Sequence, residues 1–327
     1  MNLRESLQRV TTVLVSERPA TELWPEIQEL AGLFAARGSE SIREEPRVDI
    51  GEGETWTENG LAVSPTMASM CLDDYMRTIQ FLRGTHDAID ELTKKLERPI
   101  RVLYAGCGPH ATLAVPLMSL FASNEVVFTL VDIHSVSLQS AQKTVERFGF
   151  GDSVTEYRLQ DVSSMELTGD KPDIIVTEVM QARLQKEPQV AVTRHLLAQA
   201  PEAILIPQEV RVELQLIDPS QFSSSDPDVC DPISLGSVFV LNRDVHQMPE
   251  SDGCLPAATI QLPESWDGRL QLMLTTEIRT YDSHRLTANQ SGLTCPRLYT
   301  DPAAPGAKVD FAYQLGDNPQ LVGKMSG

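Results

Sequence analysis

The pattern of hydrophobic and polar positions changes character twice along the chain. In its first part, apolar residues recur at helical spacing, as at Leu23, Ile27 and Leu30, and this spacing is typical of amphipathic helices. We expect these helices either to cover a core or to serve contacts in a homodimer. The predicted helices cover residues 3–15, 20–37 and 65–97.

Short apolar runs then alternate with helical patterns. The predicted strands are 100–105, 126–131, 153–159, 172–177 and 203–206, and the predicted helices are 111–122, 135–148 and 186–199. Such alternation indicates an α/β fold with a Rossmann-like, doubly wound parallel sheet. Ligands of such sheets bind beyond the carboxyl ends of the strands, so strand ends are where candidate chemistry belongs.

Beyond Pro207 the pattern becomes that of half-exposed β-structure. Polar and apolar residues alternate at 211–217, 271–278 and 309–313, which predicts strands with one buried face. We expect a β-barrel-like or sandwich-like half. The predicted domains are an N-terminal helical region at 1–98, a Rossmann-like cofactor-binding domain at 99–207, and a β-rich domain at 208–327.

Composition narrows the classes of function. The 327 residues are 41% apolar and 22% charged, as in globular proteins, and the net charge of −19 argues against nucleic-acid or anionic-membrane binding. The five cysteines form no C-x-x-C pair, so we expect no metal site and no disulfide framework. No signal-peptide pattern or membrane-spanning apolar run is present. We therefore expect a cytoplasmic protein.

Candidate cofactor residues follow three of the predicted strands. Gly106 and Gly108 permit a sharp turn and close approach to a ligand, and a helix beginning after them would offer free N–H groups. Asp132 ends the second strand, where ribose hydroxyls are bound in such folds. Asp161 and Val162 follow the third, where an adenine edge would lie. These residues fit a nucleoside-containing cofactor, either NAD or S-adenosylmethionine.

Two acids follow the fourth strand, in the segment T-E-V-M-Q-A-R-L-Q-K-E. Glu178 closes the strand and Glu187 comes nine positions later. Read singly, Glu178 fits a solvent-facing strand end, and Glu187 fits a helix N-terminus. Two carboxylates at a strand end could together bind a cation, exchange protons or hold a metal, or they could simply face water.

Together with the segment Asp74–Thr78, D-Y-M-R-T, these motifs resemble the protein arginine methyltransferases, a class I S-adenosylmethionine-dependent family. That family has a D-x-x-R-T helix before its first strand and a loop with two Glu nine residues apart after its fourth. It then turns through an apolar segment ending in proline into a β-barrel, and 204–207 is similar. The resemblance covers about residues 58–220.

The resemblance implies a cofactor and a role for each residue. S-adenosyl-L-methionine would be the cofactor, and Glu178 and Glu187 would be the catalytic pair that grips a guanidinium. The implied cofactor-binding residues are Arg77 for the cofactor carboxylate, Gly106 and Gly108 for its methionine part, Asp132 for the ribose, Asp161 and Val162 for the adenine, and Met180 near the methyl-bearing sulfur.

The sequence departs from the family pattern on the cofactor side at three positions. Tyr104 stands where an acid is usual, His110 where a third glycine is usual, and Val179 where the loop tryptophan is usual. His110 is expected to cap the following helix, to line the cofactor pocket, or to be a tolerated turn variant.

Further departures fall on the substrate side. The family's barrel-loop histidine pairs with the residue matching Asp74, and here His284 and Asn289 are its candidates, although His284 alone suggests an exposed turn residue. Residues 218–235 lack the helical pattern of the family's dimerisation arm. Asp87 is expected on a solvated helix face.

We therefore expect an enzyme that transfers a methyl group to a terminal guanidino nitrogen. Because the departures at the barrel loop and the dimerisation arm lie on the substrate side, the expected substrate is free L-arginine or a related small guanidino metabolite of bacterial natural-product biosynthesis. We expect no nucleic-acid or membrane partner. Three alternatives stay open, namely an arginine within a protein or peptide, another small amine, and a non-catalytic partner subunit.

Overall fold

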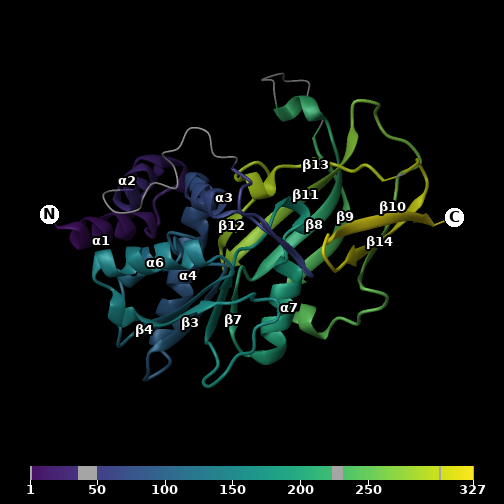
Figure 1. Cartoon of the computed structure of the whole chain (residues 1–327). Coiled ribbons are helices and arrows are strands. Elements are labelled where there is room, and N and C mark those ends of the chain that lie inside the picture. The colour runs from purple at the N-terminus through teal and green to yellow at the C-terminus, as the bar shows by residue number, and fades with distance from the viewer. Residues whose placement is uncertain (1, 36–49, 223–230, 302, 327) are drawn as a thin grey trace.

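The computed structural model describes residues 2–35, 50–222, 231–301 and 303–326 (Figure 1). It has an α/β architecture in which N-terminal helices and a five-stranded parallel sheet are followed by two antiparallel sheets. Helices α1 and α2 lie at the opposite end of the molecule from strands β10 and β14 (Figure 1). Within the described residues, no helix combines the length and the apolar character needed to cross a membrane.

The N-terminal helices agree with the helical spacing except in one place. They are α1 (Leu3–Leu14), α2 (Trp24–Ala35), α3 (Pro65–Met70) and α4 (Tyr75–Thr93), and the hairpin of β1 (Thr55–Thr57) and β2 (Gly60–Ala62) lies between α2 and α3. The single helix predicted at 65–97 is wrong. Asp74 has a non-helical backbone (φ −78°, ψ 81°) and its side chain accepts the N–H of Arg77, which caps α4 and ends the preceding turn. Residues 36 and 37 of the second predicted helix lie outside the described residues.

All five predicted strands of the parallel sheet form. They are β3 (Ile100–Ala105), β4 (Val126–Asp132), β5 (Val154–Leu159), β6 (Ile174–Thr177) and β7 (Ile204–Ile206), arranged in the order β5-β4-β3-β6-β7. The strand order reverses direction at β3, which pairs with β4 on one side and β6 on the other. The ends of these three strands therefore meet at one edge of the sheet, where ligands of this fold class bind.

Alternate residues of the parallel sheet supply two hydrophobic cores. Val102 and Tyr104 point to the larger core, which includes the apolar faces of α4 and α6 (Ser135–Phe148). Leu103 and Ala105 point to the smaller core beneath α7 (Gln189–Gln199). Side chains of successive strand residues face opposite sides, so both faces of the sheet are covered.

Two predicted helices begin later than expected. The helix predicted at 111–122 is mostly wrong, because only α5 (Val115–Met118) is helical and Ala111 has a left-handed backbone (φ 45°) that an α-helix does not accept. No long helix therefore presents free N–H groups to the glycine turn. The helix predicted at 186–199 begins at Gln189, because Lys186 is also left-handed (φ 64°) and Pro188 disfavours helical backbone before it.

The C-terminal half consists of antiparallel strands, as the alternating pattern predicts. They are β8 (Glu209–Ile217), β9 (Ile233–Asn242), β10 (Cys254–Gln261), β11 (Gln271–Tyr281), β12 (His284–Leu286), β13 (Arg297–Leu298), β14 (Lys308–Gln314) and β15 (Gln320–Ser326). One sheet has the order β12-β11-β8-β9, with β13 also on β11, and the other has β10-β14-β15. Phe239 of the first sheet stacks on Tyr313 of the second, with ring centroids 5.0 Å apart. Within the expected non-helical segment 218–235, residues 223–230 lie outside the described residues.

Helix α4 joins the parallel sheet to the C-terminal strands. Gly84 packs so closely on β11 that an added Cβ would lie 2.6 Å from Thr280 Oγ1. Thr280 Oγ1 also donates to the carbonyl of Gln80, at 2.8 Å. This close packing fixes α4, and with it Arg77, relative to the C-terminal strands.

The surface of α4 carries a second contact, and this contact corrects the expectation for His284. His284 lies in β12, partly buried, and its Nε2 is 2.7 Å from Asp87 Oδ2, so it is not an exposed turn residue. His86 Nδ1 lies 2.8 Å from the other oxygen of Asp87. Burial opposes ionisation of Asp87, but these hydrogen bonds outweigh it and hold its pKa well below the usual range. Asp87 is exposed, as expected for a solvated helix face, and it also contacts both histidines.

The packing of Gly84 predicts opposite effects for two identical substitutions. Gly84→Ala should lower the free energy of unfolding by about 1–2 kcal/mol, because overpacking against Thr280 outweighs the better helix propensity of alanine. Gly32→Ala in α2, where an added Cβ meets nothing within 4 Å, should raise it by up to about 1 kcal/mol. Urea unfolding of both variants tests this, and equal stabilisation by both would contradict it.

Candidate functional site

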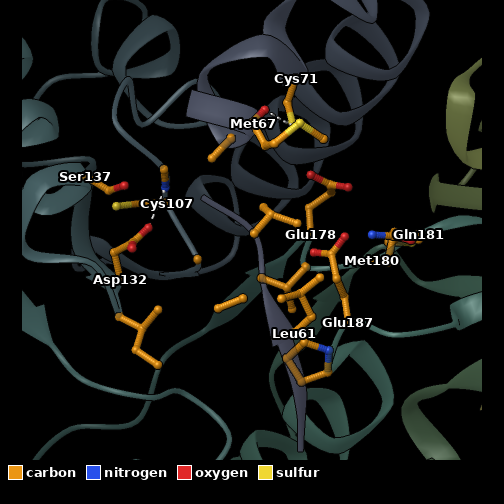
Figure 2. A pocket seen from close by; sticks show the side chains of 18 of the residues that line it. Leu61, Met67, Cys71, Cys107, Asp132, Ser137, Glu178, Met180, Gln181 and Glu187 are labelled. Atoms are coloured by element: carbon orange, nitrogen blue, oxygen red, sulfur yellow. Dashed lines mark hydrogen bonds between the residues drawn. The ribbon is translucent and has the colours of Figure 1, made fainter. Parts of the chain in front are cut away.

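A cavity of about 440 Å³ lies at the carboxyl edge of the parallel sheet, within the size range of small-molecule sites. All nine residues that the sequence predicts for the site line this cavity, although their roles remain predictions. They are Arg77, Gly106, Gly108, Asp132, Asp161, Val162, Glu178, Met180 and Glu187. Figure 2 shows the carboxylates of Glu178 and Glu187 close together, across the cavity from Asp132.

The turn after β3 forms a backbone cradle. Gly106 and Gly108 have positive φ values of 75° and 63°, which favour glycine. An added Cβ at Gly106 would collide with the side chain of Val179, from the loop after β6. The N–H groups of Gly106 and Cys107 both donate to the carbonyl of Val131, each at 2.9 Å. Gly106 therefore makes room for the side chain of Val179, whereas an added Cβ at Gly108 would make only an ordinary contact with Ala68, at 3.7 Å.

Asp132 is oriented by the backbone on both sides. Its Oδ2 accepts the N–H of Gly108 at 2.9 Å, and its Oδ1 accepts the N–H of His134 at 2.8 Å. Burial raises the pKa of Asp132, and these N–H donors oppose the rise. His134 in turn contacts Thr55 Oγ1 of β1, at 3.0 Å, so the N-terminal hairpin closes over this end of the cavity.

The residues that depart from the family pattern have structural contacts. His110 lines the cavity and stacks on Phe34 of α2, with centroids 5.4 Å apart and planes 4° from parallel. Burial raises the pKa of both Tyr104 and Cys107, so both side chains are neutral. The wall below the cradle is therefore uncharged where an acid was expected.

Glu178 is held at the end of β6 by the side chain of Gln189. Gln189 Nε2 donates to the carbonyl of Thr177 at 3.1 Å, and its Oε1 accepts the N–H of Val179 at 3.0 Å. Glu178 Oε2 forms an ion pair with Arg77. Its Oε1 is buried and has no hydrogen-bond partner among the described residues. Glu178 therefore retains an acceptor that is directed away from water and free for a donor.

Glu187 is buried in the same cavity and precedes α7. Burial raises the pKa of Glu187 to about 7, against the opposing effects of the Arg77 charge and a hydrogen bond from Gln181. The positive charge of Arg77 therefore favours the charged forms of both Glu178 and Glu187. One positive charge does not balance two carboxylates, so the pKa of Glu187 stays raised.

The loop between the two acids has an unusual backbone. Arg183, Leu184 and Lys186 have φ values of 64°, 57° and 64°, in the left-handed region that costs a non-glycine residue about 1 kcal/mol or more. Hydrogen bonds from other segments hold this backbone. They run from Arg183 N to Thr276 Oγ1 (3.0 Å), from Tyr313 Oη to Leu184 O (2.6 Å), from Lys186 N to Pro319 O (2.7 Å) and from Leu61 N to Lys186 O (2.7 Å).

The carboxylate of Asp74 is bound by residues that the sequence did not suggest. Asp74 Oδ2 accepts the hydroxyl of Ser291 at 2.6 Å and the N–H of Gly292 at 2.9 Å. Neither expected candidate fills this place, because His284 contacts Asp87 and Asn289 donates its backbone N–H to Thr294. The turn at 291–294 thus contacts the start of α4 through a hydroxyl and a backbone amide.

Arg297, Gln181 and Gln189 are further site residues that sequence reasoning missed. Arg297 and Gln181 line the cavity, and Gln189 holds the strand end. Gln189 comes two residues after Glu187. A polar side chain at the start of a helix that packs on the sheet was a signal, close to both acids in sequence, that it contributes to the site. Arg297 has no comparable signal, because it reaches the cavity from a short strand of the C-terminal sheet.

No protein-family model matches the chain, and no curated protein matches it in sequence. Among solved structures, the chain is similar to the Trypanosoma brucei PRMT1 enzyme-prozyme heterotetrameric complex with AdoHcy. The TM-score is 0.51 at 16% identity, and the match covers 80% of this chain and 93% of that chain. The protein therefore shares the fold of that structure, in which a Rossmann-like parallel sheet is combined with N-terminal helices and C-terminal antiparallel sheets.

The burial of Glu187 predicts a pH-dependent stability. Because its pKa rises from 4.5 to about 7 on folding, the folded state binds the proton more tightly, and this contribution is lost as pH rises between these values. Glu187→Gln should therefore be more stable than the wild type by about 3 kcal/mol at pH 8 and nearly equal to it at pH 4.5.

Urea unfolding at the two pH values measures this difference. Glu166→Gln, at an exposed position, is the control and should show no pH-dependent gain. The same stability difference for Glu187→Gln at both pH values would contradict the prediction.

Proposed function

We propose that the protein is an S-adenosylmethionine-dependent N-methyltransferase that acts on a terminal guanidino nitrogen. The observation that supports this most is the pair of buried carboxylates, Glu178 and Glu187, in the cavity that also contains the glycine cradle and Asp132. One part of the cavity suits a nucleoside-containing ligand and the other suits a cation.

The residues present fit S-adenosylmethionine. Gly106 and Gly108 permit the sharp positive-φ turn after β3, Asp132 supplies an oriented acceptor, and the solved structure of similar fold contains AdoHcy. S-adenosylmethionine would supply a methyl group bound to a sulfonium sulfur. After transfer of the methyl group to nitrogen, the sulfur would be the neutral thioether of AdoHcy. Asp161, Val162, Met180 and Arg77 are proposed for the adenine, sulfur and carboxylate contacts that the family resemblance implies.

The two acids are proposed to hold the guanidinium. Glu178 has a buried oxygen without a partner, and burial disfavours ionisation of Glu187. A bound guanidinium would donate a hydrogen bond to the unpartnered oxygen of Glu178, and its charge would favour the ionised form of Glu187. Charge-assisted hydrogen bonds from a planar donor also fix the orientation of the attacking nitrogen, which lowers the barrier of an in-line displacement.

Glu187 is the better candidate for accepting a proton. The attacking nitrogen forms a bond to the methyl carbon as the bond from that carbon to sulfur breaks, and the nitrogen then loses one proton. A base with a pKa near the working pH is suited to this step, and that of Glu187 lies at about 7. Glu178, in contrast, is ion-paired with Arg77.

We propose a free guanidino metabolite, with L-arginine as the first candidate, in bacterial natural-product biosynthesis. The substrate-side departures support this proposal, because the turn that contacts Asp74 uses Ser291 and Gly292 instead of a histidine. The proposal includes no nucleic-acid or membrane partner. The fold is also found in an enzyme-prozyme complex, so a non-catalytic partner subunit is the competing function.

Substituting the acids tests the proposed reaction. Purified protein is incubated with S-adenosylmethionine and either L-arginine or an arginine-containing peptide, and the products are analysed by mass spectrometry. We expect methylated L-arginine. Glu178→Gln and Glu187→Gln should each lower kcat by at least about 100-fold, because each removes charge that stabilises the transition state.

Two controls separate the alternatives. Calorimetry should show S-adenosylmethionine binding by both variants, and Glu166→Gln should keep wild-type activity. Absent cofactor binding by the wild type would support the non-catalytic subunit. Methylation of the peptide alone would overturn the small substrate, and high activity of both acid variants would indicate another amine.

A further inference from the structure

Arg297 is a cation in the wall of the cavity without a counter-ion. The charged side chains of the wall include two arginines, Arg77 and Arg297. Arg77 is ion-paired with Glu178. Arg297 is an exposed residue, and it has no ion pair and no side-chain hydrogen bond with any residue that the structure describes. An unpaired guanidinium in a ligand cavity is a ready binding group for an anion.

Arg183 adds a second positive charge beside Arg297. Its Nε is buried and has no hydrogen-bond partner among the described residues, and its terminal nitrogen donates only to Gln185. Burial and the neighbouring charge of Arg297 together lower the pKa of Arg183. Two like charges held close together are unfavourable by themselves, and an anion between or beside them would offset their repulsion.

Both arginines are fixed to the same strand. Arg297 pairs with Leu274 of β11, and the N–H of Arg183 donates to Thr276 Oγ1, two residues further along that strand. Directly opposed residues of neighbouring strands, and residues two apart within one strand, have side chains on the same face of a sheet. The side chain of Arg297 therefore lies on the face of β11 that carries Thr276 Oγ1. The position of the two charges is therefore built into the C-terminal sheet and the loop between Glu178 and Glu187.

We propose that Arg297, supported by Arg183, binds the carboxylate of the substrate, so that the substrate is a free guanidino amino acid. This inference rests on the proposed function. The acids would hold the guanidinium at one end of the substrate, and Arg297 would hold the carboxylate at the other. The carboxylate that Arg297 binds is not assigned to the cofactor. The proposed cofactor contacts come from α4 and the parallel sheet, whereas Arg297 lies in β13, on the sheet of β11.

The experiment compares L-arginine with agmatine, which has the same guanidino group and no carboxylate. The wild type should favour L-arginine by about 10–100-fold in kcat/KM, because agmatine has no carboxylate to form the charge-assisted hydrogen bonds with Arg297. Arg297→Gln should reduce this ratio to near one by raising KM for L-arginine, with kcat and the activity on agmatine little changed.

A matched control is Arg285→Gln, which removes an exposed arginine of the same sheet that pairs with Glu277. It should keep the wild-type ratio, and thermal melting should show that both variants are folded. Equal losses on both substrates in Arg297→Gln, or a wild-type ratio near one, would overturn the carboxylate site. If a peptide that ends in arginine is methylated as fast as free arginine, the proposal that the substrate is a free amino acid is wrong.

These outcomes are distinct from failure of the proposed function itself. If L-arginine, agmatine and the arginine-containing peptide are all left unmethylated while S-adenosylmethionine binds, the proposed guanidino methyltransferase is wrong, and the proposed site at Arg297 is wrong with it. If L-arginine is methylated and Arg297→Gln leaves its KM unchanged, the methyltransferase stands and only the site at Arg297 is wrong.

Discussion

Taking the carboxylates of Glu178 and Glu187 out of water costs several kcal/mol each unless charge or hydrogen bonds compensate. Arg77 supplies one positive charge near both, and it forms an ion pair with Glu178. What remains uncompensated is visible as an unpartnered oxygen on Glu178 and as a pKa of about 7 for Glu187. A cation with several N–H donors would stabilise both carboxylates in this cavity, and the proposed function depends on this electrostatic imbalance.

The two carboxylates stay buried and close together only if the backbone that carries them is held in place. Left-handed conformations at three residues between the acids would relax if the loop were free, and contacts with the hairpin and the C-terminal strands prevent this. The antiparallel sheets are thus part of the site. They determine the loop conformation, and they bring Arg297 into the same cavity.

Local signals in the sequence were enough for the central architecture. Short apolar runs marked all five parallel strands, and the residues at their ends gather at one edge because parallel strands point the same way. What the sequence could not reveal depends on distant contacts or on single backbone angles. Ser291 reaches Asp74 across more than two hundred residues, and the left-handed Ala111 abolishes a predicted helix. His284 was misread for the same reason, because its partner Asp87 is equally distant in sequence.

The hydrogen bond from Lys186 to the carbonyl of Pro319 has a consequence for the order of events during synthesis. A growing chain can complete the parallel sheet, and thus the glycine cradle, while the segment that fixes the acid loop has not yet been made. Contacts this far apart in sequence form late, because chain closure over such a distance is entropically costly. The glycine cradle and the acid pair would then form at different times during synthesis, and the loop that carries the two acids would reach its final conformation last.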